Sequence, residues 1–441
     1  MAPTAAPPTA TASPRRWAGV LSLLAIVLIS YVDRVNVSVL ITDRAFTDHF
    51  GMTGDRVLQG ALMTVFLIGY GLAAFFLTPL YESALGARRG LLVSVGLWAA
   101  LTLLSPYALG ALMFIALRFL LGVSEGPLFS LKTMYVKEHF APHEVGRPNA
   151  VSSMGVSLGT AVGLPLITYL VHRYDWHTSF VLLALLNAAI GLPLIALFIR
   201  ERRQAGERRA GHAPSGPRRG VAATLREALR TPRLGCILLI EIATLAYLWG
   251  SSSWLPAYLL QERHFSLAQM GAVSALPFLM SLASGFLGGF LIDKLSARRL
   301  PLLFVVGALG TGSCVLLVIT ADAAWLAATG LVLAGGFWGL QGPAIPTLVQ
   351  RHALAGTVGS AYGVVNGVGN LVSAFMPTAM GAAIALGGGH SFGAGYALLI
   401  GAQAITLICG AWLLLRPGPP ATEEPPVSPR TTSPAPPHPT P

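Results

Sequence analysis

The stretch from Trp17 to Thr42 reads WAGVLSLLAIVLISYVDRVNVSVLIT. It is long enough to cross a bilayer as a helix, which takes ~20 apolar residues. An acid, a guanidinium and an amide interrupt it at Asp33, Arg34 and Asn36. Each charge at the centre of a membrane helix costs ~2.5–3.5 kcal/mol on insertion scales. The stretch therefore predicts a membrane-spanning helix whose charges serve a partner or a function.

The composition of the whole chain is typical of a membrane protein. Of its 441 residues, 54% are hydrophobic and 11% are charged, whereas a soluble domain carries about 25% charged residues. The formal net charge of +11 could indicate nucleic acid binding. However, 22 of the 29 lysines and arginines fall in segments that lie on one side of a twelve-span topology. That asymmetry is the positive-inside rule, so we expect the lipid bilayer, and no nucleic acid, as the partner.

Apolar runs with short polar breaks predict an all-α membrane protein with twelve transmembrane helices in two halves of six. Hydropathy this strong favours helices over a β-barrel, whose strands would read as short alternating segments. The first six helices are expected at 17–42, 57–80, 90–107, 109–135, 147–171 and 178–199. The last six are expected at 233–260, 268–292, 300–320, 324–349, 357–386 and 393–415.

The segments outside the spans predict the domain organisation. An arginine-rich linker, 200–232, separates a first half at 17–199 from a second half at 233–415. Residues 1–16 and the Pro-rich tail 416–441 are expected to be disordered. All three segments lie on the positive, hence cytoplasmic, side. Within the linker, Thr224–Arg230 is either a short amphipathic surface helix or unstructured. We expect no cleavable signal peptide.

A repeated basic loop indicates that the two halves arose by duplication. The segment GFLIDKLSARR at 289–299 follows the eighth predicted span, and PLYESALGARR at 79–89 follows the second. Each loop stands between the second and third helix of its half. Two halves with equivalent loops on the same face predict parallel repeats that can move against each other.

With this repeat the chain resembles the major facilitator superfamily of secondary transporters. Its loop signature is Gly-x-x-x-Asp-Arg/Lys-x-Gly-x-Arg-Arg, and the second copy departs from it by Ser296 in place of the second Gly. The first copy departs further, with Pro79 for the first Gly and Ser83 for Asp. The resemblance implies that the loops hold one gating state through charge contacts, more firmly for Asp293 than for Glu82. The gating residues so implied are Asp293, Lys294, Arg298, Arg299, Glu82, Arg88 and Arg89.

Within the superfamily the chain resembles the anion:cation symporters, which move organic or inorganic anions with a proton or sodium ion. Five stretches carry this resemblance, in the order that the family has them. They are Tyr31-x-Asp33-Arg34-x-Asn36, Arg118-x-x-x-Gly122-x-x-Glu125-Gly126, Asp175-Trp176-His177, Trp254-Leu255-Pro256-x-Tyr258-Leu259 and Asn366-Gly367-x-Gly369-Asn370.

The charges of the first and fourth spans are spaced to meet. Arg118, Glu125 and Lys132 recur every seven residues, so they project from one helix face, ~10.5 Å apart along the axis. We expect that face to line the cavity between the halves, because it cannot contact lipid cheaply. Asp33 and Arg34 lie ~100° apart around their helix. We therefore expect Arg34 to face the cavity and Asp33 to face a neighbouring span.

These positions suggest roles in anion transport. A guanidinium suits a substrate carboxylate because it can donate two parallel hydrogen bonds. The resemblance implies substrate binding by Arg34 and proton coupling by Asp33 and Glu125, with Arg118 as a charge partner. The alternative is that Asp33 pairs with Arg118, or Glu125 with Lys132, only to neutralise charge. Lys132 departs from the family pattern: it either adds a second cationic contact for a dicarboxylate or acidic aromatic, or snorkels to the membrane surface.

Further polar and aromatic residues of the spans are candidates for lining the cavity, although ordinary helix packing explains each equally well. The role of Glu241, a carboxylate in the seventh span, is left open. The candidates for substrate binding beside Arg34 and Lys132 are Tyr31, Tyr70, Trp338, Gln341, Asn366 and Asn370.

The sequence thus predicts a secondary transporter and not an enzyme. We expect proton-coupled uptake of an organic anion, such as a sugar acid, a dicarboxylate or an aromatic acid, by alternating access of the two halves. Sodium is the alternative coupling ion. The alternative functions are an exporter or antiporter of the same fold, and a membrane-embedded receptor. We expect no cofactor or metal, a functional monomer, and a bacterial-type inner membrane location.

Overall fold

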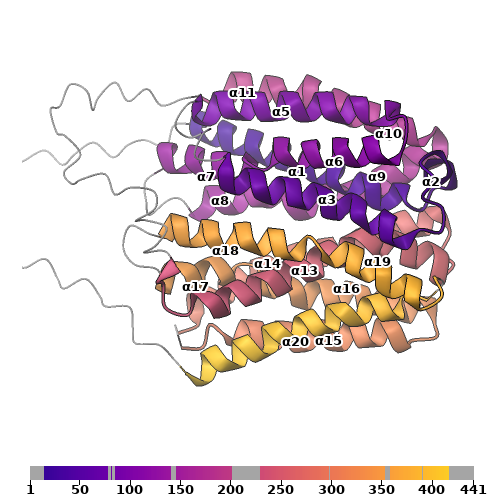
Figure 1. The fold of residues 1–441 in the computed structure, drawn as a ribbon. Helices are drawn as coiled ribbons and strands as arrows, with labels where there is room; N and C mark the ends of the chain where they lie inside the picture. The colour runs from indigo at the N-terminus through magenta and orange to yellow at the C-terminus, as the bar shows by residue number, and fades with distance from the viewer. Residues whose placement is uncertain are drawn as a thin grey trace, which may run out of the picture.

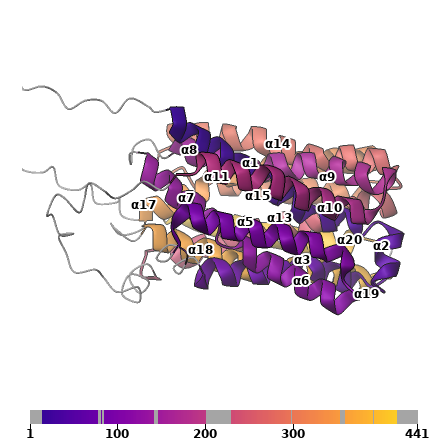
Figure 2. The same cartoon turned by 90° about the horizontal axis from the view of Figure 1, so that it is seen from above.

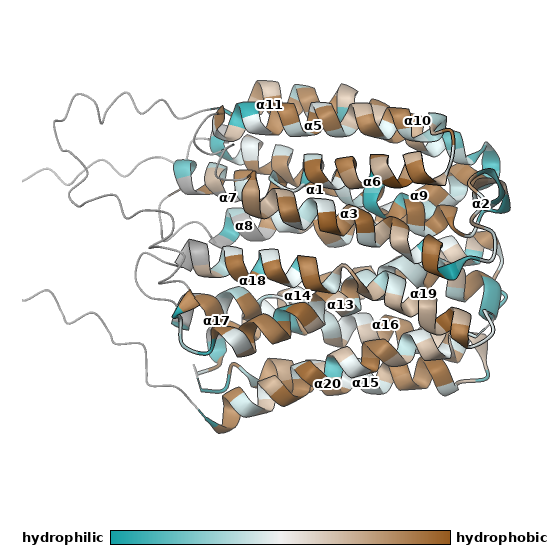
Figure 3. Cartoon of the chain, in the orientation of Figure 1, coloured by the Kyte–Doolittle hydropathy of each residue, from teal (hydrophilic) through white to brown (hydrophobic). Residues whose placement is uncertain are grey.

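The computed structural model describes residues 14–77, 81, 85–140, 146–200, 229–296, 298–352, 358–389 and 391–416. All regular structure in these ranges is helical, and twelve segments are long and apolar enough to cross a membrane. Hydrophobic residues cover most of their length, and hydrophilic residues gather toward the ends of the bundle (Figure 3). The predicted terminal segments and most of the linker, including 224–228, lie outside the described residues.

The first half is built from six spans, several of them in more than one piece. The helices that form them are α1 (Pro14–Leu40), α3 (Arg56–Phe76), α5 (Gly86–Leu104) with η2 (Ser105–Tyr107), α6 (Ala111–Glu125) with α7 (Leu128–His139), α8 (Gly146–Ser153) with α9 (Gly155–Arg173), and α10 (Trp176–Leu186) with η3 (Asn187–Gly191) and α11 (Leu192–Phe198). A short helix that the sequence did not predict, α2 (Arg44–His49), follows α1 and begins at the side-chain cap of Asp43.

The second half repeats this arrangement. Its spans are α13 (Leu234–Ala257) with η4 (Tyr258–Glu262), α14 (Leu267–Lys294), α15 (Leu302–Thr320), α16 (Ala324–Gln341) with α17 (Ala344–His352), α18 (Val358–Ser373) with α19 (Met376–Leu386), and α20 (Gly393–Leu415). Helices α1 to α11 form one bundle and α13 to α20 the other, side by side (Figure 1). We call the end at which α2 lies the α2 end, and the opposite end, with α7, α8 and α17, the linker end (Figure 2).

The breaks in the fourth and tenth spans follow the duplication. The fourth and tenth spans are both interrupted at a Gly-Pro pair, Gly126-Pro127 and Gly342-Pro343. Proline lacks an N–H and its ring disrupts the preceding turn, which accounts for both interruptions. The fifth and eleventh spans are also interrupted, but at different depths: α8 ends at Ser153 after 8 residues, and α18 ends at Ser373 after 16. The sequence predicted each of these spans as a single helix, so the breaks are a correction.

Glycines bring the halves close together toward the α2 end. A Cβ atom on Gly60 of α3 would lie 2.5 Å from the carbonyl oxygen of Pro377, and one on Gly381 of α19 would lie 2.2 Å from that of Arg56. The Thr64 hydroxyl of α3 donates a 2.6 Å hydrogen bond to the carbonyl of Ala374. Because no side chain separates the backbones at these glycines, α3 and α19 pack in direct contact.

Candidate functional site

A buried ion pair joins the first and fourth spans. The Nε atom of Arg34 donates to Oε2 of Glu125 over 2.9 Å, and the two side chains are 1% and 0% exposed. The Ser30 hydroxyl, one turn earlier on α1, donates to the same oxygen over 2.9 Å. The Nη2 atom of Arg34 and Oε1 of Glu125 have no hydrogen-bond partner among the described residues. The pair therefore keeps one donor and one acceptor that the described part of the chain does not use.

Aromatic rings surround the guanidinium. Its Cζ atom lies 4.5 Å from the ring centre of Tyr31, 4.6 Å from that of Tyr70, 5.3 Å from that of Phe66 and 5.8 Å from that of Trp249. Ring faces attract a cation, so these contacts offset part of the loss of hydration. Trp249 comes from α13 and stacks on Tyr31 at 6.3 Å. The two halves of the molecule thus meet at Arg34.

Asp33 faces away from this cage. Its Oδ2 atom accepts hydrogen bonds from the Trp98 indole over 2.8 Å and the Thr102 hydroxyl over 2.7 Å, both on α5. Its Oδ1 atom has no partner among the described residues. The consecutive residues Asp33 and Arg34 therefore serve different contacts, in the directions that helix geometry predicts.

Arg118 is a buried cation near both acids. Its side chain is fully buried, and its Cζ lies 4.8 Å from the ring centre of Phe66. It interacts electrostatically with Asp33 and Glu125, yet no guanidinium nitrogen has a hydrogen-bond partner in the described part of the chain. The predicted alternative that Arg118 neutralises Asp33 therefore stays open, because the two charges interact although no hydrogen bond joins them. Glu125 pairs with Arg34 and not with Lys132.

Lys132 lies on α7, beyond the Gly126-Pro127 break. Its Nζ donates to the Ser153 hydroxyl over 2.6 Å and lies 4.8 Å from the ring centre of Phe129. The side chain is 4% exposed. It therefore does not snorkel to solvent in this conformation, which was one of the two alternatives predicted for it.

The second half contributes a chain of amides. Asn366 Nδ2 donates to Glu241 Oε1 over 3.3 Å, and Asn370 Nδ2 donates to Asn366 Oδ1 over 3.3 Å. The Trp249 indole donates to Asn370 Oδ1 over 3.2 Å. Because Trp249 stacks on Tyr31, this chain connects Glu241 of α13 to the cage around Arg34. The partner of Glu241, which the sequence left open, is thus an amide of α18.

Two predicted lining residues make their contacts elsewhere. The Trp338 indole donates to the carbonyl of Thr244 over 3.0 Å. Gln341 is fully buried and donates to Gln403 over 3.1 Å. Both sets of contacts lie within the second half, as expected for the alternative of ordinary helix packing.

The predicted gating loops lie at the linker end. Arg88 donates to the carbonyl of Ala196 over 2.7 Å, within its own half. The Lys294 ammonium lies 4.2 Å from the ring centre of Phe290, also within its own half. Arg89, Arg298 and Arg299 are exposed, and Glu82 and the side chain of Asp293 lie outside the described residues. The gating roles stay predictions.

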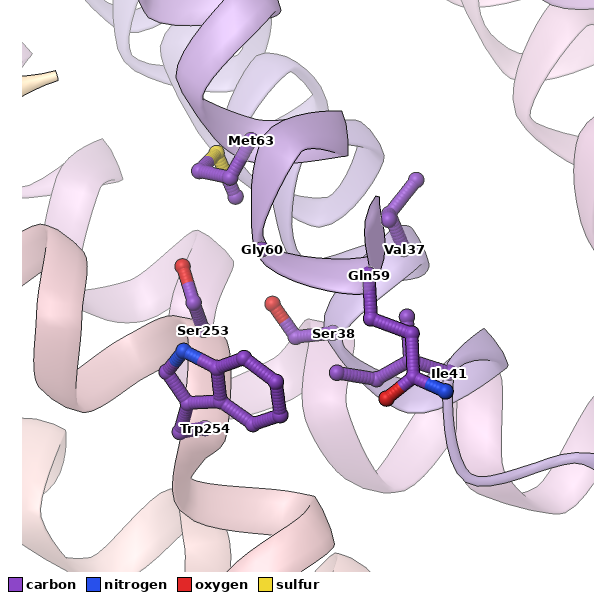
Figure 4. Close-up of a pocket in the computed structure, with 8 residues that line it drawn as sticks. All are labelled: Val37, Ser38, Ile41, Gln59, Gly60, Met63, Ser253 and Trp254. Atoms are coloured by element: carbon purple, nitrogen blue, oxygen red, sulfur yellow. The ribbon is translucent and has the colours of Figure 1, made fainter. Parts of the chain in front are cut away.

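A small cavity marks the contact between the halves on the α2 side of Arg34 (Figure 4). Ser38, one turn beyond Arg34 on α1, faces it with a hydroxyl that has no hydrogen-bond partner among the described residues. The cavity volume of ≈ 10 Å³ is about the least that a single water molecule needs. Its lining residues are Val37, Ser38, Ile41, Gln59, Gly60, Met63, Ser253 and Trp254. This cavity is too small for a substrate.

Several residues around the two charges carry no signal in the sequence. Phe66 and Trp249 contact Arg34, and Trp98 and Thr102 bind Asp33, but none of the four was predicted. Aromatic residues are common in apolar helices, so the sequence alone offered no reason to prefer these over others. Only their proximity to Asp33 and Arg34 in three dimensions distinguishes them.

Comparison with known proteins gives consistent matches. The family described as Major Facilitator Superfamily matches residues 23–377. A probable galactarate/D-glucarate transporter of Bacillus subtilis is 26% identical over 435 residues, covering 91% of this chain and 92% of that protein. A D-galactonate transporter of Escherichia coli is 24% identical, covering 66% of this chain and 70% of that protein.

A solved structure extends the similarity to the fold. The crystal structure of a D-xylose-proton symporter matches with a TM-score of 0.73 at 14% identity. The match covers 92% of this chain and 98% of that one. The twelve spans and their two bundles are therefore arranged as in a known transporter fold.

Proposed function

We propose that this chain, which belongs to the Major Facilitator Superfamily, takes up a sugar acid together with protons. Its family and relatives are transporters, and it is a multi-pass membrane protein. The relatives' names include the transport of galactarate, D-glucarate and D-galactonate. These compounds are polyhydroxylated carboxylates, which is the chemistry that a buried guanidinium can recognise.

The observation that carries this proposal is the buried pair of Arg34 and Glu125. The carboxylate of Glu125 occupies Nε of the guanidinium and leaves Nη2 without a partner among the described residues. A substrate carboxylate would compete with Glu125 for the same cation. Protonation of Glu125 removes its charge and releases Arg34 to the substrate, so proton binding and anion binding favour each other.

The surrounding charges support this coupling. Asp33 and Glu125 lie with Arg34 and Arg118 in a buried cluster that is neutral when all four are ionised. Each proton taken up by an acid then leaves a buried positive charge without compensation, which is costly in the membrane. A bound anion compensates it. Asp33, whose Oδ1 has no partner among the described residues, is the second proton carrier in this scheme.

Alternating access would follow from the two bundles. In this conformation direct packing of α3 against α19 holds the halves together at the α2 end. We propose that this end faces the outside and that the linker end, with the arginine-rich segments, faces the cytoplasm. The protein would then act as a monomer in a bacterial-type inner membrane, with both termini inside.

Uptake into proteoliposomes tests the proposal. The full-length protein is reconstituted, an inward proton gradient is imposed, and accumulation of radiolabelled galactarate and galactonate is followed with a protonophore as control. We expect accumulation that the protonophore abolishes. If a sodium gradient drives accumulation instead, the coupling ion is sodium and not the proton. If neither gradient drives uptake while counterflow of labelled acid stays intact, the protein transports in a different direction and the symport proposal is wrong.

A further inference from the structure

We propose that Lys132 is a second anion contact, and that the site therefore selects an acid with two carboxylates. This inference rests on the proposed function and names the class of sugar acid within it. Lys132 lies in the same half as Arg34, on α7, which follows α6 with its Glu125 (Figure 1). The two cations belong to one continuous set of contacts.

A short ladder of rings connects the two cations. The Arg34 guanidinium lies 4.5 Å from the ring centre of Tyr31. The rings of Tyr31 and Phe129 meet edge to face at 6.5 Å, and the Lys132 ammonium lies 4.8 Å from the ring centre of Phe129. Tyr31 and Phe129 thus form a wall with a cation at each end.

The ring ladder limits how far apart the two cations can lie. Its three steps of 4.5, 6.5 and 4.8 Å lead from the Arg34 guanidinium to the Lys132 ammonium, so the distance between the cations cannot exceed the length of this path. With a charge-assisted hydrogen bond of ~2.8 Å at each end, a six-carbon diacid fits within that limit, with its hydroxyl groups along the ring wall.

In the described part of the chain, Lys132 makes no ion pair with a carboxylate. Among the described residues no carboxylate lies within 4.0 Å of its Nζ, and its hydrogen bond goes to a neutral hydroxyl. An ammonium carries three donors, and Ser153 uses one. A buried cation with unused donors is costly unless an anion meets it. The charges of Arg34 and Arg118 already balance those of Asp33 and Glu125. The positive charge of Lys132 can therefore be balanced by one further negative charge, which a second substrate carboxylate would supply.

A purely structural role would look different. In that case Lys132 would tie α7 to the break between α8 and α9 through Ser153, and its loss would affect every substrate equally. As an anion contact, Lys132 affects only acids that carry a second carboxylate. The two acids galactarate and galactonate separate these roles, because they share a carbon chain and differ in a carboxylate against a hydroxymethyl group at one end.

The experiment measures half-saturating concentrations for both acids with full-length protein in proteoliposomes. Lys132→Met removes the charge, Lys132→Arg keeps it, and Ser153→Ala removes the hydrogen-bond partner. Arg173→Met, which removes an exposed cation at the α2 end, is the matched control. We expect Lys132→Met to raise the half-saturating concentration of galactarate about tenfold to a hundredfold and to leave that of galactonate unchanged. Lys132→Arg and Ser153→Ala should retain the preference for galactarate.

Competition in the wild-type protein gives a test that needs no variant. Unlabelled galactarate should displace label at lower concentration than galactonate does. If the wild type takes up galactonate and no diacid, the second contact is wrong and the proposed function stands. If it takes up neither acid, both proposals fail. An equal loss for both acids in Lys132→Met and in Ser153→Ala would assign Lys132 a structural role and overturn the inference.

Discussion

Arg56 of α3 donates a 2.6 Å hydrogen bond to the side-chain carbonyl of Gln261 in η4, which belongs to the other half of the molecule. The same Nη2 atom donates to the carbonyl of Gly389 over 3.2 Å. Arg56 also keeps a contact in its own half, where Nη1 donates to Gln59 over 3.1 Å. A transporter that opens at the α2 end must break the two contacts between the halves. Arg56 therefore links the two halves at this end through these hydrogen bonds.

Removing the Arg56 side chain should favour opening at the α2 end. Arg56→Met loses both contacts between the halves, and hydrogen bonds from a charged donor contribute ~1.5–3 kcal/mol each. A shift of this size changes a two-state population at least about tenfold. The readout is labelling of Ser253→Cys, which lines the small cavity, by a membrane-impermeant maleimide. The background has Cys236, Cys314 and Cys409 replaced by alanine.

A control for this measurement lies on the same face. Arg44→Met removes an arginine that is 88% exposed and pairs with Asp48 of α2, inside its own half. We expect faster labelling in Arg56→Met and wild-type labelling in Arg44→Met. Equal labelling rates in all three proteins would show that Arg56 does not hold the halves together.

Gly60 should behave as a second determinant of the same contact. A Cβ at this position lies 2.5 Å from backbone of the other half, which cannot move aside without separating α3 from α19. Gly60→Leu should therefore shift the protein toward the state open at the α2 end while each half stays folded. The matched control is Gly96→Leu, since nothing lies within 4 Å of a Cβ there. Monodisperse Gly60→Leu protein with unchanged Ser253→Cys labelling would contradict this expectation.

The fold was predictable from the sequence because bilayer thickness and hydropathy constrain it directly. The predicted last span, 393–415, coincides with α20 (Gly393–Leu415). The breaks after Glu125 and Gln341 were missed because each depends on one Gly-Pro pair inside an apolar run, which hydropathy averages away. Helix α2 was missed because its six residues are too few for a periodic signal.

The site was predictable only where charge marked it. Buried charges in spans are rare and costly, so Arg34, Asp33, Glu125 and Arg118 stand out in the sequence alone. Their partners do not, because which acid meets which cation depends on the rotation and packing of separate helices. Trp249 illustrates the limit: it reaches Arg34 from the other half, and no spacing rule within one helix connects α1 to α13.

Arg34→Lys should lose most transport although it keeps the charge. The guanidinium bonds Glu125 through Nε and has Nη2 to spare, while its planar face lies among four rings. An ammonium is a point charge that cannot reproduce both contacts at once. We expect initial uptake rates to fall at least about tenfold, at equal amounts of reconstituted protein. Arg173→Lys is the control. Near-normal uptake rates in Arg34→Lys would mean that transport does not depend on the planar, multi-donor geometry of the guanidinium.

Asp33→Asn should uncouple transport from the proton gradient. Asparagine can still accept hydrogen bonds from Trp98 and Thr102 through its carbonyl, so the contact with α5 is retained. It cannot carry a proton. We expect accumulation to be lost while exchange of labelled for unlabelled acid continues. Trp98→Phe leaves the carboxylate in place and serves as the control for altered packing. Full accumulation by Asp33→Asn would remove Asp33 from the coupling role.

Glu125→Gln should bind substrate without needing a proton. In the wild type, rising pH deprotonates Glu125, which then reclaims Nε of Arg34 and excludes the substrate carboxylate. Wild-type affinity should therefore weaken from acidic to alkaline pH. Glutamine is neutral at every pH and holds the guanidinium less strongly than a carboxylate does. Equilibrium binding of labelled acid to the purified variant should accordingly be at least as tight as in the wild type and should change less with pH, because only Asp33 can still take up a proton, whereas gradient-driven accumulation is lost. Affinity in Glu125→Gln that falls with pH as steeply as in the wild type would place the proton-sensitive group elsewhere, with Asp33 the first residue to test.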